Sequence, residues 1–571
     1  MSSSDDLIQL IESFEIYLGN PAQPNTPCNF QQSLLCDEQE VLAWAQLKYI
    51  QQWGYTDYLI PNDVGGKLDS LIDLYFLTKS LARRDLTTAI AMGLSFFGAL
   101  PTWIAGTPEQ KKQLADRIRQ GDIVALALTE ESHGTDLTAN ETKSTSYKDG
   151  WELSGQKWCV NFATQSQITT VLCRSNEKGG LLGFSLFSID KSIVGEAYKP
   201  TPKLPTHGVR GLDISGFSLD KVFVSKNALL GKEQQGLEIT YKTFQISRTL
   251  CACLSLGGAD TALRLAVSFS LQRQLYGKTV YEIPAVKQRL GEQFTQLLIA
   301  DCTALAVIRA CTAMPEKMSF WSAIIKFLIP KITEDIVEQC AVIVGARAYL
   351  RTTEWAVFQK IRRDIQVIGL FDGSSQVNLA LIAGNLLPQA AMRGTGKQKN
   401  RDKLERIFKI KQACSPLDTL NLRLFTHEED DILAGISQIQ SEPINHLVLL
   451  IQDEILHFDQ QLLHLRDQKL YDPRSLSAFR MAEHYCWIFA ASCCLQFWYY
   501  NQESLSEDLK NINWLNLAIE LILGKLHATK IGDATLQEAM ADDLCQYFHQ
   551  NKMFSVISSK IAETSTDLIV E

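Results

Sequence analysis

The sequence predicts an α+β protein that is mostly helical, with a central antiparallel β domain between helical domains. Apolar residues recur at spacings of three and four over most of the chain, which is typical of amphipathic helices. Between residues 122 and 235 the pattern changes to short alternating runs separated by glycine-containing turns, which is typical of an antiparallel barrel or sandwich. A chain of 571 residues is also too long for one compact core, so we expect several domains.

The first two domains follow from these patterns in chain order. Residues 1–121 are predicted to form an N-terminal helical domain, because DLIQLIESFEIYL, DEQEVLAWAQLKYIQQWGY and SLIDLYFLTKSLARRD carry helical periodicity. Residues 122–235 are predicted to form the central β domain, with candidate strands that include IVALALTE, ITTVLCRS and GFSLDKVFVS. The change of pattern near residue 122 sets the boundary between them.

The rest of the chain is predicted to be helical, with one interruption. Residues 236–392 return to long helical periodicity and are predicted to form a four-helix bundle domain. The basic run RGTGKQKNRDKLER follows, and residues 393–410 are interpreted as a solvated linker, with binding to an anionic partner or a membrane surface as the alternative. Residues 411–571 are predicted to form an additional C-terminal helical domain.

Composition excludes some classes of function. The net charge is -9 with both signs interspersed, which argues against nucleic-acid binding. The start MSSSDDLIQLIESF lacks the basic region of a signal peptide, and the longest strongly apolar run, WIFAASCCLQFWYY, is shorter than the roughly 20 residues that span a bilayer. We therefore expect a cytoplasmic protein without a transmembrane segment. The 14 cysteines lack zinc spacing, so we expect reduced, buried thiols and no metal site.

One acidic residue stands in an unusual place. Asp372 directly precedes a glycine and two serines at the end of an apolar segment, in RRDIQVIGLFDGSSQV. Asp before Gly is ordinary turn chemistry, because both residues tolerate the backbone angles of a tight turn. The alternative is that the carboxylate of Asp372 acts as a base.

Several motifs in one order resemble the flavin-dependent acyl-CoA dehydrogenases. They are GTPEQKKQLADRIRQGDIVALALTEESHGTD, GQKWCVN, QRQLYGK and RRDIQVIGLFDGSSQ, and they span about residues 40–390. The order of helical, β and helical domains is similar to that family as well. The added C-terminal block is similar to the very-long-chain branch.

The resemblance implies an FAD site at the end of the β domain. ALTEESHGTD would line the flavin ring, with Thr129 as a hydrogen-bond partner of the ring and Thr135 near substrate and pyrophosphate. GQKWCVN departs from the family, which usually has an aromatic residue and then a hydroxyl residue at Cys159 and Asn161. Trp158, one position earlier, is expected in the core. It cannot simply take the missing aromatic role, because adjacent strand residues face opposite ways. The implied contacts from these two motifs are Leu126, Leu128, Thr129, Gly134, Thr135, Cys159, Val160 and Asn161.

The resemblance also implies an FAD contact that crosses a subunit interface. QRQLYGK supplies Arg273 and Tyr276, which in the family reach a neighbour's flavin pyrophosphate, and the planar guanidinium suits a phosphate. Pro284 stands where the family has a glutamine, so one contact is expected to be lost. The remaining implied FAD residues are Gly345, Ser374 and Gln376. A homodimer or homotetramer is expected.

A substrate site is implied around Asp372. Arg248 is expected near the start of a long helix, where the dipole disfavours a cation, which hints at a local anion or a functional use. Ser247 occupies the position at which some members carry their catalytic glutamate, so the base must come from elsewhere. Gly93 lies four residues after Ala89 on one helix face, which predicts a deep acyl pocket or close helix packing. The implied substrate residues are Gly93, Thr135, Gln245, Ser247, Arg248, Phe371 and Gly373.

The function implied is FAD-dependent α,β-dehydrogenation of an acyl thioester, with Asp372 as the base that takes the α-proton. Asp372 stands where the family has its catalytic glutamate, and it reaches one methylene less far. The acyl carrier is CoA or a carrier protein, and an electron-transfer flavoprotein is the implied electron acceptor. The alternatives are a flavin oxidase or monooxygenase on the same fold, and a non-catalytic homologue that binds acyl groups or a partner.

Overall fold

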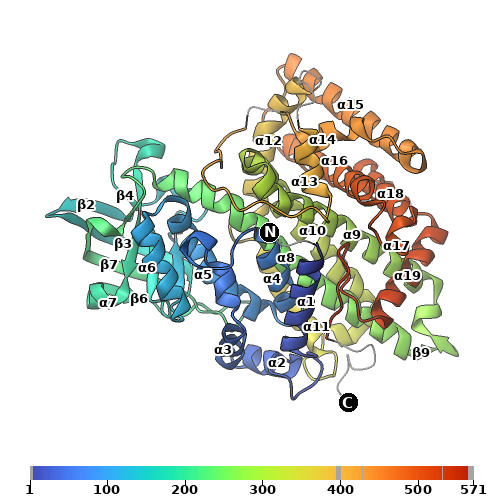
Figure 1. The fold of residues 1–571 in the computed structure, drawn as a ribbon, viewed down its shortest axis with the longest axis horizontal. Coiled ribbons are helices and arrows are strands. Elements are labelled where there is room, and N and C mark those ends of the chain that lie inside the picture. Colours follow the sequence, from blue (N-terminus) through green and yellow to red (C-terminus); the bar gives the residue numbers. More distant parts are fainter. Residues whose placement is uncertain (1–3, 394–399, 427–428, 530–531, 563–571) are drawn as a thin grey trace.

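The computed structural model describes residues 4–393, 400–426, 429–529 and 532–562. A β domain lies at one end of the molecule, and helices form the remainder (Figure 1). The helices of residues 4–119 lie between the sheet and the later helices, and α5 (Leu86–Ala105) packs against strand β1 (Val124–Ala127). The predicted order of helical, β and helical parts is confirmed.

The N-terminal helices begin at residues that cap them. Asp85 precedes α5, and its carboxylate accepts a hydrogen bond from the Thr88 N–H at 3.0 Å. α6 (Pro108–Arg119) begins with a capping box, in which Thr107 and Gln110 satisfy each other's free backbone N–H groups. The other helices of this part are α1 (Ser4–Leu18), α2 (Phe30–Glu38), α3 (Trp44–Gln52) and α4 (Leu71–Ala82).

The β domain is one sheet of eight strands in the order β6-β7-β3-β2-β4-β5-β8, with β1 paired to β4. The pairs are antiparallel with two exceptions: β1 runs parallel to β4, and β2 meets β4 in parallel at its first residue. The remaining bounds are β2 (Lys143–Tyr147), β3 (Gly150–Asn161), β4 (Ile168–Arg174), β5 (Phe184–Asp190), α7 (Lys191–Val194), β6 (Tyr198–Pro200), β7 (Ile214–Ser225) and β8 (Leu229–Leu230).

Strand β3 is irregular near its end. Its register with β7 shifts between Lys157 and Val160, and Cys159 lies in the left-handed region with φ 57°. The prediction that Trp158 lies in the core is wrong, because this bulge interrupts the alternation of faces. The side chain of Trp158 is 37% exposed, and Cys159 beside it is exposed too.

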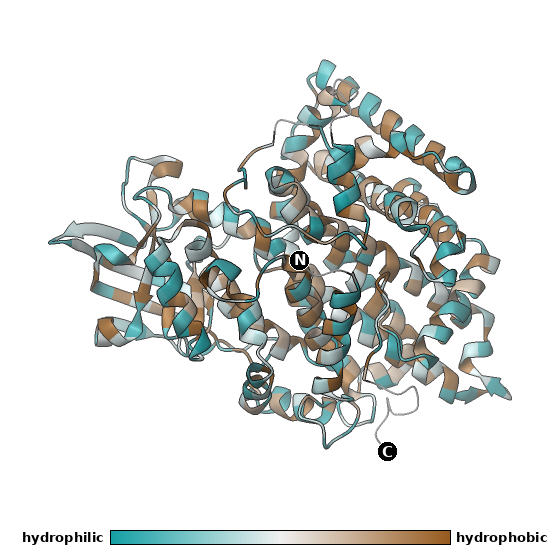
Figure 2. Ribbon diagram, in the orientation of Figure 1, coloured by the Kyte–Doolittle hydropathy of each residue, from teal (hydrophilic) through white to brown (hydrophobic). Residues whose placement is uncertain are grey.

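Long apolar helices form the centre of the molecule. α8 (Gly236–Gln272) packs against α4, α5, α9 (Pro284–Ala313) and α10 (Met318–Val344). Hydrophobic residues run along these central helices, whereas the outer helices have mixed faces (Figure 2). Two shorter helices, α11 (Ala356–Asp364) and α12 (Ser375–Met392), complete this part.

The length of these helices corrects an expectation from the sequence. Considered as whole helices and not as uninterrupted apolar runs, α5, α8 and α9 are each long and apolar enough to cross a membrane by length and composition alone. In this structure 72% of the apolar window of α5 is buried inside the protein, and 100% of those of α8 and α9. A helix that is apolar all round is buried either in a large core or in a membrane.

The C-terminal helices pack onto α9 and α12. α16 (Leu476–Asn501) contacts both, and α19 (Ala534–His549) lies along α9. Part of the predicted linker 393–410 is a helix, α13 (Arg401–Phe408), whose Leu404, Ile407 and Phe408 are buried; residues 394–399 lie outside the described residues. The other helices are α14 (Asp431–Gly435), α15 (Asn445–Asp467), α17 (Glu507–Lys510) and α18 (Asn513–His527).

Two segments without helices tie this C-terminal part to the rest. Residues 409–426, here called the strap, cross from α13 to α4 and α8: Leu417 N–H donates to Asp69 O at 2.8 Å, and Leu422 is fully buried. Residues 551–562, here called the tail, reach buried acids of the central helices. In the tail the Phe554 N–H donates to Asp260 Oδ2 at 2.7 Å, and the Ser555 hydroxyl donates to Asp301 Oδ2 at 2.5 Å.

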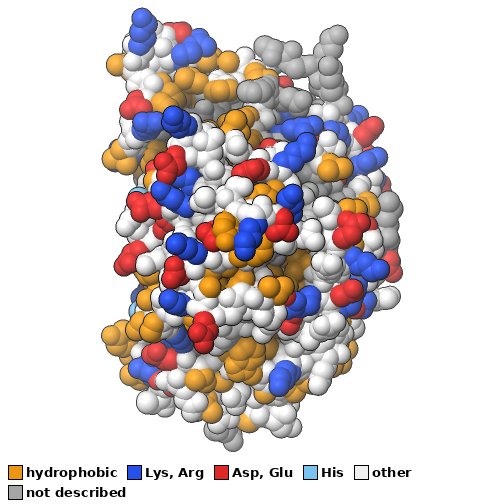
Figure 3. Space-filling view, turned by 90° about the vertical axis from the view of Figure 1, so that its left-hand side faces the viewer, with side chains coloured by type: hydrophobic (Ala, Val, Ile, Leu, Met, Phe, Trp, Pro, Cys, Tyr) orange, Lys and Arg blue, Asp and Glu red, His pale blue; other side chains and the backbone are white. Residues whose placement is uncertain are grey.

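On the face at the sheet end of the molecule, basic and acidic side chains are interspersed (Figure 3). This agrees with the mixed charge pattern of the sequence.

Candidate active site

Asp372 lies in a tight turn between the 3-10 turn Ile365–Gly369 and helix α12. The φ angles of Asp372 and Gly373 are 53° and 95°, so the pair adopts the turn conformation that Asp-Gly predicts. A Cβ on Gly373 would lie 2.9 Å from Arg248 Nη2, so the turn needs glycine for its conformation and for its lack of a side chain. The side chain of Asp372 is half-buried, and its nearest recorded partner is Cys251 Sγ at 3.9 Å from Oδ2.

Arg248 connects this turn to α8. Its buried guanidinium donates from Nε to Asp372 O at 2.9 Å and lies 5.0 Å from the centroid of the Phe244 ring. Burial lowers the pKa of Arg248, and the charge of Asp372 opposes this. The expectation that Arg248 stands near a helix start is wrong, because α8 begins at Gly236. Arg248 therefore interacts with the neighbouring Asp372 turn, and its position has no relation to the dipole at the start of the helix.

Two neighbours of Arg248 on α8 carry polar atoms without partners. Gln245 Nε2 donates to Arg423 O of the strap at 2.8 Å, but Gln245 Oε1 is buried and has no hydrogen-bond partner among the described residues. The buried hydroxyl of Ser247 likewise has none within the described part of the chain. Leaving such a group unsatisfied costs about 1–3 kcal/mol. These two atoms therefore indicate where polar groups of a ligand would bind.

The loop after β1 forms the opposite side of the site. Thr129 O accepts a hydrogen bond from the Trp158 N–H at 3.0 Å, which joins the loop to the bulge of β3. Lys157 Nζ donates hydrogen bonds to this loop, to Leu128 O at 3.0 Å and to Glu130 Oε1 at 2.8 Å. Leu126 and Thr129 are half-buried, Leu128 and Val160 are buried, Gly134, Thr135 and Cys159 are exposed, and Asn161 is half-buried.

Tyr241 lies between this loop and Arg248. Burial raises the pKa of Tyr241, Arg248 opposes the rise and Asp136 of the loop adds to it, so both charges are near its hydroxyl. Leu126 and Phe244 also pack on the same apolar cluster, which includes Leu128 and Leu237. The β-domain loop and the Asp372 turn therefore flank the same stretch of α8.

Arg273 and Tyr276 lie elsewhere. They belong to a short hairpin, β9 (Gln274–Leu275) and β10 (Lys278–Thr279), in which Tyr276 is 93% exposed. The hairpin projects from the edge of the molecule opposite the sheet (Figure 1). These residues are therefore not brought to the loop site of their own chain. Gly345 is exposed at the end of α10 with φ 68°, whereas Ser374 and Gln376 lie at the start of α12 beside Asp372.

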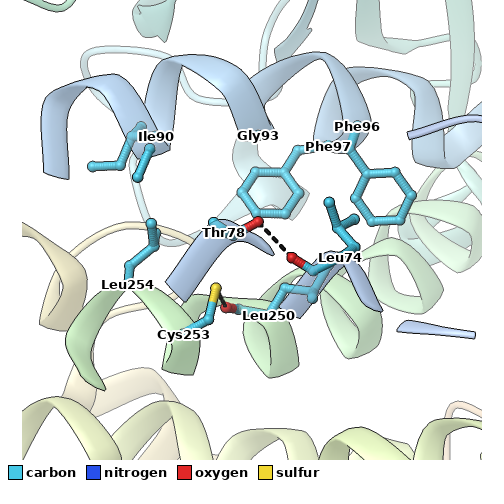
Figure 4. Close-up of a pocket in the computed structure, with 10 residues that line it drawn as sticks. Leu74, Thr78, Ile90, Gly93, Phe96, Phe97, Leu250, Cys253 and Leu254 are labelled. Atoms are coloured by element: carbon cyan, nitrogen blue, oxygen red, sulfur yellow. Dashed lines mark hydrogen bonds between the residues drawn. The ribbon is translucent and has the colours of Figure 1, made fainter. Parts of the chain in front are cut away.

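An apolar pocket lies next to the site, between α4, α5 and α8. Ala89 is one of its lining residues. Gly93 and Leu250 line it as well (Figure 4). Its one hydroxyl, on Thr78, is already bonded to Leu74 O at 2.7 Å. The other lining residues are Leu74, Ile90, Phe96, Phe97, Cys253 and Leu254. Leu250 and Leu254 follow Arg248 on α8 by two and six residues. These two pocket residues therefore lie about 3 Å and about 9 Å from Arg248 along the helix axis.

The pocket suits a hydrocarbon group. A Cβ on Gly93 would meet no atom within 4 Å, so this position leaves space that a larger side chain would fill. The alternative drawn from the sequence, close helix packing at Gly93, does not apply there. Phe371 is half-buried and packs against the same core from the Asp372 side.

Sequence reasoning missed three features of the site. Lys326 of α10 is buried and donates to Ile368 O just before the Asp372 turn; its signal is a lysine inside the apolar run AIIKFLIP. Cys251, one turn after Arg248, faces Asp372. The strap reaches Gln245 through Arg423 O, and no local pattern predicts that contact.

Comparison with known proteins identifies the domains. Residues 125–222 match the model of the acyl-CoA dehydrogenase middle domain, and residues 234–387 match that of the acyl-CoA dehydrogenase C-terminal domain. Subunit CarC of the caffeyl-CoA reductase-Etf complex of Acetobacterium woodii is 26% identical over 347 residues, 60% of this chain and 89% of that protein.

Solved structures share the fold. An acyl-CoA dehydrogenase of Bacillus anthracis, complexed with FAD, superimposes with a TM-score of 0.72 at 16% identity, over 95% of this chain and 90% of that one. Its fold therefore includes the C-terminal helices. The prolyl acyl carrier protein oxidase AnaB superimposes with a TM-score of 0.60 at 19% identity, over 66% of this chain and 98% of that one.

The residues between the β-domain loop and α8 fit FAD, the cofactor of this family. Thr129 and Thr135 offer hydroxyls that make no hydrogen bond to any described residue, and the exposed Trp158 and Cys159 form a surface beside them. The two matched domains, the shared fold and this site lead to one conclusion. The chain carries the middle and C-terminal domains of the acyl-CoA dehydrogenases, which are FAD-dependent oxidoreductases.

Proposed function

We propose that this protein removes hydrogens from Cα and Cβ of an acyl thioester, with Asp372 as the base that takes the α-proton. The observation that carries the proposal is the position of Asp372. Its backbone carbonyl accepts a hydrogen bond from the buried Arg248, and its carboxylate lies 3.9 Å from Cys251 Sγ on the same helix. Leu250, which precedes Cys251, lines the apolar pocket. No other carboxylate belongs to this set of predicted residues, because Ser247 stands at the alternative position.

FAD would be held on one side by the β-domain loop and the bulge of β3. Thr129 and Thr135 would offer hydroxyls to it, and the residues around Val160 at the end of β3 would line it from the sheet. When bound, FAD supplies the acceptor for the hydride from Cβ. Lys157 fixes the loop that makes these contacts, through Leu128 O and Glu130.

The residues of this chain carry the proton chemistry. An α-proton beside a thioester is weakly acidic, so a carboxylate must be held within about 3 Å of it. Arg248 fixes the backbone of Asp372 through its carbonyl oxygen, and the left-handed turn leaves the N–H of Asp372 without an acceptor among the described residues. That N–H is available to polarise the thioester carbonyl, which stabilises the negative charge as it develops.

The pocket between α4, α5 and α8 would hold the acyl chain. Its walls are apolar, so they favour a hydrocarbon group over a polar one. The thioester carrier is CoA or a carrier protein, and the likeness to AnaB supports the second possibility. The relative from the caffeyl-CoA reductase-Etf complex supports an electron-transferring flavoprotein as the electron partner.

A second candidate is an oxidase on the same fold. The specific observation that favours it is the bulge at Cys159, which exposes Cys159 and Trp158 where the family usually presents an aromatic and a hydroxyl side chain. Oxygen reactivity of a reduced flavin depends on these surroundings. Rapid oxidation of the reduced enzyme by air favours the oxidase, and slow oxidation favours the dehydrogenase.

We also propose that two copies of the chain form the working unit. The hairpin with Arg273 projects away from the sheet of its own chain, so its guanidinium is available to a neighbour's pyrophosphate. Val342 and Tyr349 near Gly345 are 64% and 79% exposed, and these apolar side chains support an interface at this end of α10.

The first prediction tests the base. Asp372→Asn keeps the shape of the side chain but deletes the proton acceptor, and a positioned base contributes roughly 100 to 10,000-fold. We expect the variant to bind FAD and to lose the rate of flavin reduction by that factor. The measurement is anaerobic stopped-flow bleaching of the flavin with a panel of acyl-CoA and acyl-carrier thioesters.

Glu334→Gln is the matched control. Its carboxylate lies close to Gly369, 3.2 Å from a Cβ built there, and is the other half-buried acid near the turn. This variant should keep its maximal reduction rate within about threefold, because Glu334 touches no predicted substrate atom. Full reduction by Asp372→Asn would make Asp372 only a turn residue.

A further inference from the structure

Lys326 is the exception among the buried lysines of the described chain. Five lysines are buried there, and four have a carboxylate at short distance: Lys79 with Asp301 at 2.6 Å, Lys157 with Glu130 at 2.8 Å, Lys317 with Asp431 at 2.9 Å and Lys360 with Asp364 at 2.5 Å. Lys326, 1% exposed, has no carboxylate within 4.0 Å in the described residues. Burying a charge without a paired partner is costly, so this arrangement needs an explanation.

The contacts of Lys326 lead to the catalytic turn. Its Nζ donates to Ile368 O and lies 5.0 Å from the centroid of the Phe371 ring, so both contacts are in the segment directly before Asp372. An ammonium over an aromatic face is attracted by the ring. Lys326 therefore fixes the turn from α10, whereas Arg248 fixes it from α8.

Lys326 also acts on the turn by its charge. Burial lowers the pKa of Lys326, Arg248 adds to this, and Cys251, Asp372 and Glu334 oppose it. The titratable groups that interact with Asp372 from the packed helices are Arg248 and Cys251 of α8 and Lys326 of α10, and Glu334 of α10 acts on Lys326. Two cations thus converge on one turn.

We propose that Lys326 is a positioning residue for Asp372, and that its positive charge keeps this base ionised and stabilises the charge that forms on the thioester during proton removal. The proposal rests on the proposed function. The reaction moves the α-proton to Asp372 and the Cα–H electron pair into the new Cα–Cβ double bond, while the Cβ hydrogen leaves with its pair to oxidised flavin.

The arrangement suits each stage of this transfer. Before the reaction the cations favour the ionised form of Asp372, which is the form able to accept a proton. As Asp372 is neutralised, negative charge develops on the thioester carbonyl. The side chains of Arg248 and Lys326 are both buried beside the turn, where charge stabilisation is stronger than in water. A carboxylate paired directly with Lys326 would cancel this effect.

The test separates the charge of Lys326 from its hydrogen bond. Lys326→Gln keeps a donor for the Ile368 carbonyl and removes the charge, Lys326→Met removes both, and Lys326→Arg keeps both. Loss of a nearby positive charge raises the pKa of a carboxyl, typically by 1–3 units, so the acid limb of the pH profile of flavin reduction should move to higher pH by about one unit or more in the Gln and Met variants. At pH 7 the rate should fall about tenfold, and Lys326→Arg should restore the limb.

Lys331→Met is the matched control on the same helix. Its side chain is 47% exposed and pairs with Glu483, so its loss should leave the pH limb in place. A second readout needs no turnover: isotope-edited infrared spectroscopy follows ionisation of the Asp372 carboxyl, whose band is assigned by its loss in Asp372→Asn. That band should titrate at higher pH in Lys326→Gln.

Each outcome decides the matter. A wild-type pH limb in the Gln and Met variants contradicts the proposal, even where Asp372→Asn is inactive and the proposed function stands. Loss of FAD or of the fold in both neutral variants gives Lys326 a purely structural role and also contradicts it. Normal flavin reduction by Asp372→Asn overturns the proposed function itself. This outcome is distinct from the outcomes above, because it is measured on a different variant.

Discussion

Gly373 determines how closely Arg248 approaches the acidic turn. Its φ of 95° is one that side chains rarely adopt, and a Cβ there would lie 2.9 Å from Arg248 Nη2 and 3.4 Å from its Cζ. The guanidinium is buried and cannot move into water without losing its bond to Asp372 O. The positions of Asp372 and Arg248 therefore both depend on the lack of a side chain at Gly373.

Gly373→Ala should disrupt the contact between Arg248 and the Asp372 turn. The new Cβ strains the backbone by about 1–3 kcal/mol and displaces Arg248 from the turn, so we expect loss of flavin reduction by at least tenfold together with a lower thermal midpoint. Gly121→Ala is the control, because Gly121 has a similar φ of 97° and nothing within 4 Å of its Cβ.

The two variants separate strain from contact. A thermal melt should show similar destabilisation in both variants. Stopped-flow measurement of flavin reduction should show reduced activity only in Gly373→Ala. Equal activity in the two would mean that the position of Arg248 does not matter for catalysis.

At the scale of elements, α8 joins the parts of the site. Its Tyr241 lies near the β-domain loop, Arg248 at the Asp372 turn and Leu254 in the apolar pocket. α8 would therefore set the order of parts along a bound substrate, with the thioester near Arg248 and the hydrocarbon tail beyond it. The depth of the pocket therefore depends on the small residues of α5 that face α8.

Gly93→Phe should shorten the acyl group that the enzyme accepts. The Phe ring would occupy space that is free around Gly93, so activity on long acyl thioesters should fall by at least tenfold more than activity on short ones. The measurement is kcat/KM over a series of chain lengths. Gly384→Phe, on the exposed side of α12 and with open space at its Cβ, controls for placing Phe in a helix. An equal loss at all lengths would contradict a role of Gly93 in pocket depth.

The sequence predicted the elements better than their mutual contacts. Helical periodicity and the Asp-Gly pair gave the helices, the β domain and the Asp372 turn, because these depend on neighbours along the chain. Trp158 was misplaced because a bulge is set by pairing with β7, and Arg248 was misplaced because no capping signal marks Gly236. The contact of Lys326 with Ile368 joins residues 42 positions apart, and no local pattern encodes it.

At the scale of the whole molecule, the two ends of an FAD would be served by different chains. The β-domain loop lies at one end of the molecule, and the hairpin of Arg273 projects from the other. Both can act on one cofactor only if a second copy brings its hairpin to the first copy's sheet. FAD binding and association of the chains should therefore be linked.

Arg273→Ala should reveal this linkage. Loss of the guanidinium removes a charge-assisted bond to phosphate, so we expect weaker FAD binding, by about tenfold or more, and more monomer at low protein concentration. Analytical ultracentrifugation with and without FAD measures both. Lys278→Ala, in the same hairpin and exposed, is the control. Unchanged FAD affinity in Arg273→Ala would contradict the exchange of hairpins between chains.

The tail, residues 551–562, supplies hydrogen-bond donors to buried acids of the central helices. Asp260 and Asp301 are buried in the central helices, and they receive hydrogen bonds from Phe554 N–H, Ser555 Oγ and Val556 N–H. During synthesis on a ribosome these acids are made long before the tail emerges. Until then both carboxylates lack these donors, and water or Lys79 and Arg83 must satisfy them alone. The hydrogen bonds from the tail to these two acids can therefore form only after residues 554–556 have been synthesised, when the central helices that carry the acids have already been made.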